Sequence, residues 1–430
     1  MENFDAIIIG ASVAGSSAAA HLASQGHHVL VIDQSVFPRD RLSTHFLWPR
    51  GVSYLNRLGV AGEILKKTPN YRRMNIYIEG VKLSGSIPLD DIRKRFLKVH
   101  NDCHHATDIY CGPRRLLLDY ELLKAAELAG AEIRQNVKFS SLLTENGAVT
   151  GISATTGNGN TFQAKAKIVI GADGRHSSFA DAVQAEVYDR REDSTFAFFG
   201  YYSGLNKEEL TISNRGRLGS AIFPTSDGTH MALAYGPASW WKDFSRHAEN
   251  NFFKTFDFCD EETAALIREG KREKSFKGCE KMVAFQRKSI GPGWALIGDA
   301  GSFKDQVTAM GMTHALRDSE LISGYLGRAL SGLMSVNRAL EEYEHARAND
   351  YENYFNFVCD VARLPIRSED DIQHITNISQ SQEDTNHFLS QFGDTRPLNE
   401  SQGTGDKAGA VTKVAGYDVQ RDGYLYSLYG

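Results

Sequence analysis

Blocks of apolar and polar positions at the start of the chain predict a β-α-β unit. Residues 6–9 form an apolar run with the length of a buried strand, and residues 29–32 form a second run that ends on Asp33. The stretch between them begins with a glycine-bearing turn and continues as an Ala-rich, helix-favouring segment to about Gln25. We therefore expect two parallel strands connected by a helix.

The turn after the first strand has the composition of a nucleotide-binding loop. Gly10 allows a tight turn, Gly15 lets the helix pack closely on the strand, and Ser12 stands where the usual pattern has its middle glycine. The first helical turn, which contains Ala14, offers free N–H groups to a pyrophosphate. Asp33 lies 18 positions after Gly15, where a carboxylate accepts hydrogen bonds from a ribose diol. Together these features predict dinucleotide binding.

The remaining chain alternates between strand-like and helix-like segments. Residues 115–129 carry leucines at helical spacing, and residues 149–155 and 161–165 have the pattern of a hairpin. Alternating aromatic positions from residue 195 to 235 indicate a second, sheet-based domain. We expect short strands within 73–99, and helices at 49–58, 312–347, 351–361 and 369–391.

Composition narrows the class of protein. The 430 residues carry a net charge of −5 that is spread along the chain, which gives no reason to expect a nucleic-acid partner. No apolar stretch approaches the ~18 residues of a membrane span. The first residues run directly into a strand rather than a signal peptide, so we expect a cytoplasmic protein.

The five cysteines are scattered, which is typical of reduced thiols. Cys103, His104, His105 and Cys111 are potential metal ligands that lie close together in the sequence. They lack the paired C-x₂-C spacing of a structural zinc site. We therefore expect a polar loop there and no metal site.

Two further motifs follow apolar strands. The first is Gly171-Ala-Asp173-Gly174-Arg-His-Ser177, and the second is Leu296-Ile-Gly298-Asp299-Ala300, followed by Lys304-Asp305 and Ala309-Met-Gly311-Met312-Thr313. With the first loop, they give the chain a resemblance to the FAD-dependent monooxygenase superfamily with the para-hydroxybenzoate hydroxylase type of fold. That superfamily also includes flavin-dependent halogenases and geranylgeranyl-reductase-like flavoproteins. The resemblance extends over roughly residues 1–395.

The resemblance implies an α/β fold class. It comprises a Rossmann-like FAD-binding domain, an inserted antiparallel β-sheet substrate domain and C-terminal helices. The expected boundaries are 1–72, 100–185 and 280–345 for the FAD-binding domain, 73–99 and 186–279 for the substrate domain, 346–395 for the C-terminal helices, and 396–430 for a flexible tail. Within this tail, residues 424–429 are expected to dock back onto the protein.

The resemblance also implies FAD as the bound dinucleotide. In that arrangement the first loop faces the pyrophosphate and Asp33 faces the adenosine ribose, while Asp299 holds the sugar side of FAD. Asp173 lies near FAD and the path of NADH or NADPH, and Arg115, in an R-x-x-L-D arrangement, reaches FAD.

The helix that begins at Gly311 points its N–H groups at the flavin C2 carbonyl. Physical chemistry agrees, because reduced flavin carries negative charge near N1 and O2, which a helix N-terminus stabilises. The residues expected at the cofactor are Gly10, Ser12, Ala14, Gly15, Asp33, Arg41, Arg115, Asp173, Asp299, Gly311, Met312 and Thr313.

Several side chains are candidates for the pocket around the flavin. Arg41 is either a partner of the pyrophosphate or a surface arginine. His45 is either an acid/base catalyst or a packed interface histidine. Asp305 is expected to orient either the substrate or the hydroperoxide, and Gln306 follows it where many members of the superfamily have proline. The aromatic side chains expected to roof the flavin are Phe196, Phe198, Tyr202, Phe223 and Tyr235.

The resemblance implies a monooxygenase that hydroxylates a small organic substrate, aromatic or polyketide-like, through a flavin C4a-hydroperoxide. Dioxygen is the co-substrate and NADH or NADPH is the reductant, acting directly or through a separate flavin reductase. Three alternatives stay open: a geranylgeranyl-reductase-like reductase or dehydrogenase, a flavin halogenase without the tryptophan-halogenase motif W-x-W-x-I-P, and a non-catalytic FAD-binding protein.

Overall fold

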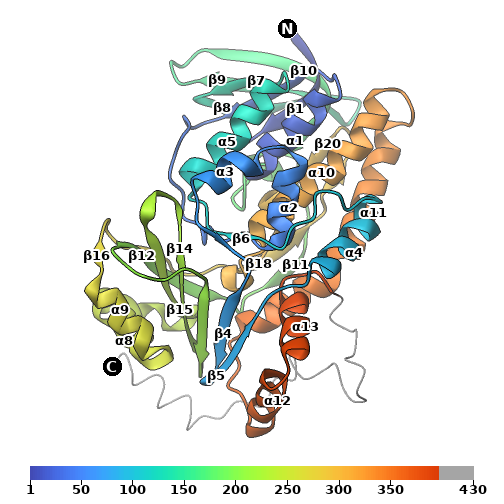
Figure 1. The fold of residues 1–430 in the computed structure, drawn as a ribbon. Helices are drawn as coiled ribbons and strands as arrows, with labels where there is room; N and C mark the ends of the chain where they lie inside the picture. Colours follow the sequence, from blue (N-terminus) through green and yellow to red (C-terminus); the bar gives the residue numbers. More distant parts are fainter. Residues whose placement is uncertain (397–430) are drawn as a thin grey trace.

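The computed structural model describes residues 1–396, and two large β-sheets organise it (Figure 1). The first sheet has the strand order β19-β20-β10-β1-β2-β7, in which β20, β10, β1, β2 and β7 are parallel neighbours. β8 and β9 form an antiparallel ribbon that continues into β10, as the hairpin pattern predicted. The strands of this sheet are β1 (Glu2–Ile9), β2 (Val29–Asp33), β7 (Glu132–Gln135), β8 (Val137–Glu145), β9 (Ala148–Thr156), β10 (Thr161–Gly171), β19 (Ile290–Gly291) and β20 (Trp294–Leu296).

Helices cover one face of this parallel sheet. Ile8 of β1 packs toward the helices, whereas Ile7 and Ile9 pack in a separate apolar cluster with the β8–β9 ribbon. Helix α1 contacts both α5 and α10. The helices of this part of the chain are α1 (Val13–Ser24), α2 (Pro49–Arg57), α3 (Ala61–Lys66), α5 (Arg115–Leu128), α6 (Ser178–Ala182) and α10 (Gly311–Leu330).

The second sheet is built from two distant parts of the chain. Its order is β16-β12-β15-β14-β13-β4-β5, and β17 also pairs with β12. Helix α8 packs against β12, β13, β14 and β15. The strands are β4 (Met74–Ile78), β5 (Val81–Gly85), β12 (Thr195–Ser203), β13 (Thr211–Arg215), β14 (Leu218–Pro224), β15 (His230–Pro237), β16 (Lys271–Arg272) and β17 (Lys277–Cys279), and the helices are α7 (Trp241–Arg246), α8 (Ala248–Cys259) and α9 (Glu261–Glu269).

One pairing in this sheet differs from the predicted antiparallel arrangement. β13 runs parallel to β4, while the other neighbours are antiparallel. The β4–β5 hairpin precedes the rest of the sheet by more than a hundred residues, so no tight turn fixes its direction relative to β13. Two small sheets contain the remaining strands. In the first, β3 (Asn70–Tyr71) pairs with β6 (Tyr110–Cys111). The second has three strands in the order β11 (Val187–Arg191), β18 (Ala284–Arg287) and β21 (Ser302–Phe303).

Two predicted segments form different secondary structure. Within 73–99, strands occupy only residues 74–85, and residues from Leu89 onward form helix α4 (Leu89–His100) because Asp90 and Asp91 in its first turn favour a helix start. The predicted helix at 312–347 is two helices, since the chain turns through Gly332, whose φ is +80°, before α11 (Val336–Ala362) begins. The C-terminal pattern forms α12 (Glu369–Ser379) and α13 (Gln382–Phe392).

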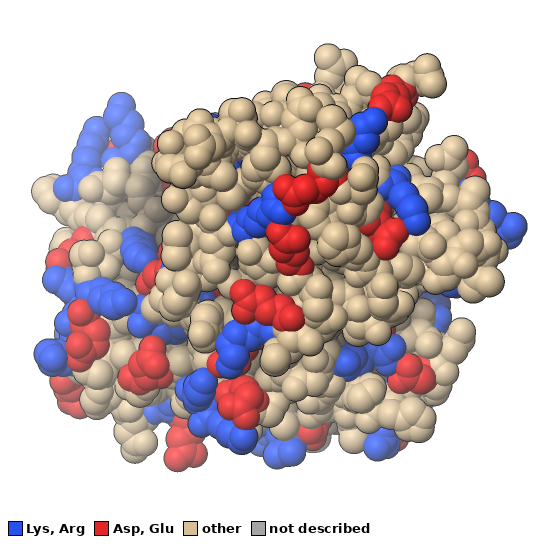
Figure 2. All heavy atoms as spheres, turned by 90° about the horizontal axis from the view of Figure 1, so that it is seen from above, with Lys and Arg blue, Asp and Glu red and all other residues tan. Residues whose placement is uncertain are grey.

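The predicted flexible tail, from residue 397 onward, and the expected docking of residues 424–429 lie outside the described residues. On the face shown in Figure 2, Lys and Arg are interspersed with Asp and Glu rather than gathered into a field of one sign. In the described range 1–396, no helix has the length and apolar character needed to cross a membrane.

A buried charge cluster connects the end of the last described helix, α13, to helices α2, α4 and α10. The carboxylate of Asp394, just after α13, accepts hydrogen bonds from Arg50 of α2 and from Arg95 of α4 (3.3 Å). It also lies 3.1 Å from Nε2 of His314 on α10. Arg50 is fully buried and the Asp394 side chain is 8% exposed. This cluster holds α13 against helices that come from distant parts of the sequence.

We predict that Asp394→Ala lowers the free energy of unfolding by about 3–5 kcal/mol, because it leaves buried arginine charge without its carboxylate. The measurement is chemical denaturation of the variant beside Asp90→Asn, which removes a carboxylate from the surface pair of Asp90 with Arg93. The control is expected to change stability by less than about 1 kcal/mol. Equal effects of the two substitutions would contradict the anchoring role of Asp394.

Candidate functional site

A cavity of about 710 Å³ opens at the carboxyl ends of the parallel strands, within the size range of ligand sites. Its wall continues onto β12 and β15 of the second sheet through Ala197, Phe199, Met231 and Leu233. This is the edge where open α/β sheets bind ligands. The predicted site residues on its wall are Gly10, Ser12, Ala14, Asp33, Arg41, Arg115, Asp173, Asp299, Asp305, Gly311 and Met312.

The glycine loop brings backbone close to the cavity. Gly10 has a φ of +105°, and a Cβ there would lie 2.5 Å from the carbonyl oxygen of Ala172. A Cβ on Gly15 would lie 1.7 Å from the carbonyl oxygen of Gly10, so Gly15 supports the loop from behind rather than lining the cavity. The hydroxyl of Ser12 is buried without a hydrogen-bond partner among residues 1–396. The glycine loop and the N-terminus of α1 together present N–H groups and the Ser12 hydroxyl to the cavity.

Asp33 is held in place at the end of β2. One carboxylate oxygen accepts from the N–H of Ala11 (2.9 Å), and the other accepts from the N–H of Ser35 (2.8 Å). Arg39, which the sequence did not single out, lies 3.3 Å from the first oxygen. A carboxylate has about four acceptor sites, so capacity remains for one ribose hydroxyl.

Two guanidinium groups add positive charge to the same wall. Arg115 forms two hydrogen bonds of 2.8 Å with Asp119, one turn later on α5. Burial lowers the pKa of Arg41, and the nearby charges of Arg39 and Arg115 lower it further. These side chains give the cavity a cationic side suited to phosphate.

Two predicted carboxylates differ in what they contact. Asp173 accepts from the hydroxyls of Ser177 and Ser178 and from the N–H of Phe179 (3.2 Å), so it organises the start of α6 while lining the cavity. Asp299 has no hydrogen-bond partner within the described residues, and burial raises its pKa. Asp299 is therefore available to a ligand, whereas Asp173 is largely engaged.

Lys304 is a wall residue that sequence reasoning did not assign to the cofactor. Its ammonium donates to the hydroxyl of Ser302 at 3.2 Å. Burial lowers its pKa to about 8, and the carboxylates of Asp318 and Asp299 act in the opposite direction. It places a cation beside Asp299 in the cavity.

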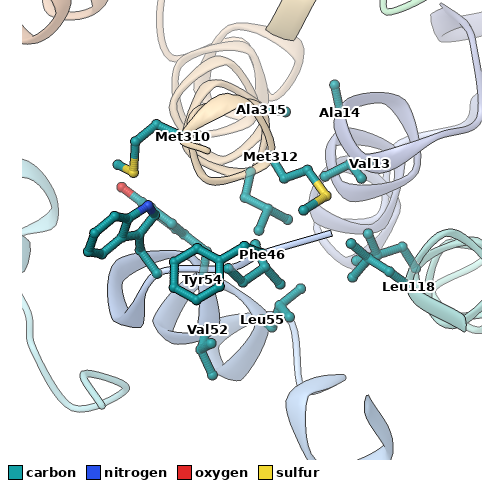
Figure 3. Packing of buried hydrophobic residues seen from close by; sticks show 14 of the residues in the cluster. Val13, Ala14, Phe46, Val52, Tyr54, Leu55, Leu118, Met310, Met312 and Ala315 are labelled. Carbon is teal, nitrogen blue, oxygen red and sulfur yellow. The ribbon is translucent and has the colours of Figure 1, made fainter. Parts of the chain in front are cut away.

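The start of α10 also lines the cavity, beside the start of α1 (Figure 3). Gly311 and Met312 line the wall, and no side chain caps this helix. Figure 3 shows Met312 and Ala315 of α10 beside Val13 and Ala14 of α1. The N-termini of two helices therefore converge on one cavity. Thr313 is not on the cavity wall, and its hydroxyl points toward α2, where a Cβ on Gly51 would lie 2.6 Å from it.

Asp305 lines the cavity, but its carboxylate is occupied. It accepts from the N–H (2.7 Å) and the hydroxyl (2.8 Å) of Thr195 and from the N–H of Val307 (3.0 Å). Burial raises its pKa to about 6, and these hydrogen bonds act in the opposite direction. The geometry therefore favours a structural role, in which Asp305 connects β12 to the loop before α10, over the predicted direct contact with substrate.

His45 lies away from the cavity wall, contrary to the predicted acid/base position. It is fully buried, and its Nε2 lies 2.5 Å from the hydroxyl of Tyr201 on β12. Burial lowers the pKa of His45 to about 3, with a smaller contribution from Arg115, so the ring is neutral at pH 7. The alternative of a packed interface histidine fits this environment.

The aromatic residues of β12 alternate in the opposite phase to the one expected. Phe196, Phe198 and Tyr202 pack in the cluster under α8. Phe199 faces the cavity instead, with Ala197. A strand places successive side chains on opposite faces, and the sequence does not reveal which face lines the cavity.

Phe223 and Tyr235 line a second, smaller cavity of about 30 Å³, the inner pocket. Its wall is otherwise made by apolar residues of β13, β14 and β15 and by Phe46 and Trp48. It shares Thr44, Leu233, Gln306 and Ala309 with the large cavity, so the two adjoin. The sequence pattern could not predict that Phe46 and Trp48 share a pocket with strands that lie more than 150 positions away in the chain.

The cysteines are free thiols. Within residues 1–396, no group of three or more His, Cys, Asp or Glu side chains is arranged to hold a metal ion. Cys111 is buried on β6, paired with Asn70 of β3, apart from the loop that carries Cys103.

A family model for the FAD-binding domain matches residues 3–357. The chain belongs to the FAD-binding domain family. It is 24% identical over 360 residues to the digeranylgeranylglycerophospholipid reductase of Methanocella arvoryzae, covering 79% of this chain and 82% of that protein. It is 26% identical over 357 residues to the mitochondrial squalene epoxidase 2 of Arabidopsis thaliana, covering 79% of this chain and 57% of that protein.

Solved structures share the fold of this FAD-binding protein. The myxobacterial chondrochloren halogenase CndH matches with a TM-score of 0.74 and 20% identity over 96% of each chain. A flavoprotein/dehydrogenase from Cytophaga hutchinsonii matches with a TM-score of 0.76 and 16% identity, covering 91% of this chain and 93% of that one. The predicted superfamily and fold class are confirmed, and the chain is an FAD-dependent oxidoreductase by family.

The residues present fit FAD. The unpartnered hydroxyl of Ser12, the loop N–H groups and the guanidinium of Arg41 suit a pyrophosphate, and Asp33 suits a ribose. Asp299, without a protein partner in the described range, suits the hydroxyls of the ribityl chain. The individual contacts remain predictions.

We predict that Gly15→Ala weakens FAD binding and lowers stability by about 1–3 kcal/mol, because its Cβ overlaps the Gly10 carbonyl. The matched control is Gly62→Ala, at a helical glycine of α3 with no atom within 4 Å of the added Cβ. Fluorescence titration of apoprotein with FAD, together with melting temperature, compares them. Wild-type FAD affinity in Gly15→Ala would refute this account of the loop.

The raised pKa of Asp305 predicts a pH-dependent stability. Between the unfolded value of 3.8 and the folded value of about 6, the folded state binds more protons, so stability falls as pH rises through this window. From pH 4 to pH 7 the wild type is expected to lose about 2 kcal/mol relative to Asp305→Asn, which cannot titrate. Denaturation of both proteins across this range measures the difference, and parallel pH profiles would contradict a raised pKa.

Proposed function

We propose that the protein is a monooxygenase that hydroxylates a small organic substrate, using FAD, dioxygen and NADH or NADPH. The observation that carries the proposal is the inner pocket, which adjoins the cofactor cavity at the start of α10. A substrate in this pocket lies beside the end of the cavity where the superfamily holds the flavin ring. The squalene epoxidase relative supports oxygen insertion as the type of reaction.

Bound FAD supplies electron transfer from the nicotinamide and the activation of dioxygen. The chain positions and stabilises it. The N–H groups at Gly311, Met312 and Thr313 have no acceptor within their own helix, and they aim positive potential at the cavity. Such fixed dipoles stabilise the negative charge that a reduced flavin carries near N1 and O2.

The inner pocket excludes water from the reacting centre. Phe46, Trp48, Phe223 and Tyr235 are all buried, and the indole N–H of Trp48 is satisfied by the carbonyl of Thr308 at 2.9 Å. A dry pocket protects a reactive oxygen donor from loss to solvent. The hydrogen bonds that Asp305 accepts from Thr195 and Val307 fix the loop that separates this pocket from the cofactor cavity.

Hydride transfer to an activated double bond is the second candidate function. The digeranylgeranylglycerophospholipid reductase relative is matched over 82% of its own length, and a reductase needs the same cofactor cavity and a similarly dry pocket. The two functions differ in the fate of oxygen. A monooxygenase transfers one atom of dioxygen to its product, whereas a reductase needs none.

We expect that FAD-loaded protein, reduced anaerobically with NADH or NADPH and then mixed with ¹⁸O₂ and a panel of candidate substrates, gives a product heavier by one ¹⁸O atom. Reduction supplied by a separate flavin reductase is the parallel arm, because the nicotinamide path is not fixed. Mass spectrometry of the products is the readout. A product that forms under anaerobic conditions with a saturated double bond would replace the proposal with the reductase.

A further inference from the structure

A third cavity continues the line that runs from the cofactor cavity through the inner pocket. This outer groove, of about 60 Å³, shares Ile212, Tyr235 and Val307 with the inner pocket. It lies between β4 and β13 of the second sheet and the C-terminal helices, which Figure 1 shows beside β5. The apolar side chains contributed by the helices are Ile375, Ile378, Phe388 and Phe392. The three cavities thus follow one another through shared wall residues.

The inner pocket and outer groove are narrow and mostly apolar. The polar and charged residues of their walls are Thr44, Gln306 and Thr308 in the inner pocket and Glu79, Asn214, Arg367, Asp371 and His374 in the outer groove. A cavity needs roughly 10–15 Å³ for each water molecule, so these spaces correspond to only a few water molecules each. A chain of methylene or isoprene-like units is slim enough to follow such a path with small side-chain adjustments. A fused aromatic ring system would have to displace several packed residues at once, which is costly in a close-packed core.

Gln306 places an amide group in the wall at the end nearest the cofactor cavity. The amide nitrogen Nε2 of Gln306 is buried and has no hydrogen-bond partner in residues 1–396. Gln306 lines both the inner pocket and the cofactor cavity. A buried donor without an acceptor costs free energy, and a ligand oxygen that accepts from it removes that cost.

We propose that the inner pocket and outer groove bind one slim, elongated apolar substrate whose carbonyl oxygen accepts a hydrogen bond from Gln306 beside the cofactor cavity. The apolar chain extends past Tyr235 and Ile212 into the outer groove. Gln306 sets the position of the substrate along the path, and the groove selects for length. The inference rests on the proposed function only in naming this molecule a substrate, since the binding itself requires no oxygen transfer.

The test is a binding titration of the FAD-loaded, full-length protein, followed by the change in flavin absorbance. The probes are unbranched methyl ketones of six, eight and ten carbons, with the flat ketone 2-acetylnaphthalene as comparison. We expect affinity to rise up to about fourfold for each added methylene while the chain fills the path. The fused-ring ketone is expected to bind more weakly than the ten-carbon ketone.

Gln306→Leu removes the amide while keeping a similar volume. We expect it to weaken binding of the ten-carbon ketone about three- to tenfold and to leave binding of 1-decene, which has no carbonyl, unchanged. Ile378→Phe narrows the outer groove and is expected to reduce the gain from eight to ten carbons, whereas Ile378→Val is the matched control. FAD affinity and melting temperature report whether each variant folds, and the ketone series on the wild type decides the matter if one does not.

Tighter binding of 2-acetylnaphthalene than of every chain ketone, or unchanged ketone binding by Gln306→Leu, would overturn the inference. The outcome is separable from that of the proposed function. Ketones that bind as expected while no substrate acquires ¹⁸O would refute the monooxygenase and leave the binding path intact. Hydroxylation of a flat aromatic substrate, with affinity unaffected by Gln306→Leu, would support the monooxygenase and refute the binding path.

Discussion

The contact between α1 and α10 is the constraint on which the cofactor cavity depends. α1 is made largely of alanine, glycine and serine, which lets a second helix approach its backbone. The hydroxyl of Ser319 on α10 donates to the carbonyl of Ala14 at 2.7 Å, and that of Ser323 donates to Ala18 at 3.2 Å. These direct bonds from side chain to backbone set the distance between the two helices. Both helix N-termini then reach the same cavity, one at the glycine loop and one at Gly311.

The second sheet is attached to this arrangement by buried polar contacts. Asp305 links Thr195, at the start of β12, to the loop that precedes α10. His45, before α2, contacts Tyr201 on the same strand. Because a buried polar group is costly to leave without its partner, such contacts specify one position of the sheet over the cofactor cavity. Apolar contacts alone would allow the sheet to slide.

The sequence predicted those residues of the cavity wall that belong to a motif of consecutive residues. Gly10, Ser12 and Asp33 were found because a strand, a turn and a helix follow one another in the chain, and Asp299 because it follows a buried strand. The inner pocket was not found, because Trp48 and Tyr235 meet only in three dimensions. Strand β12 shows a different limit: its aromatic residues occur on both faces, so alternation predicted a strand without revealing its orientation. His45 shows a third, since its type suggested acid/base chemistry while burial decides its charge.

The position of α12 and α13 has a consequence for how such a protein diversifies. These helices form one wall of the outer groove but contribute nothing to the cofactor cavity, whose walls come from residues before Val336. Their attachment through Asp394 is to side chains of α2, α4 and α10. Exchange of this segment between homologues would therefore reshape the end of the groove without replacing a residue of the cofactor-cavity wall. The wall that α12 and α13 give to the groove and the wall of the cofactor cavity are encoded in separate parts of the polypeptide, which allows each to evolve on its own.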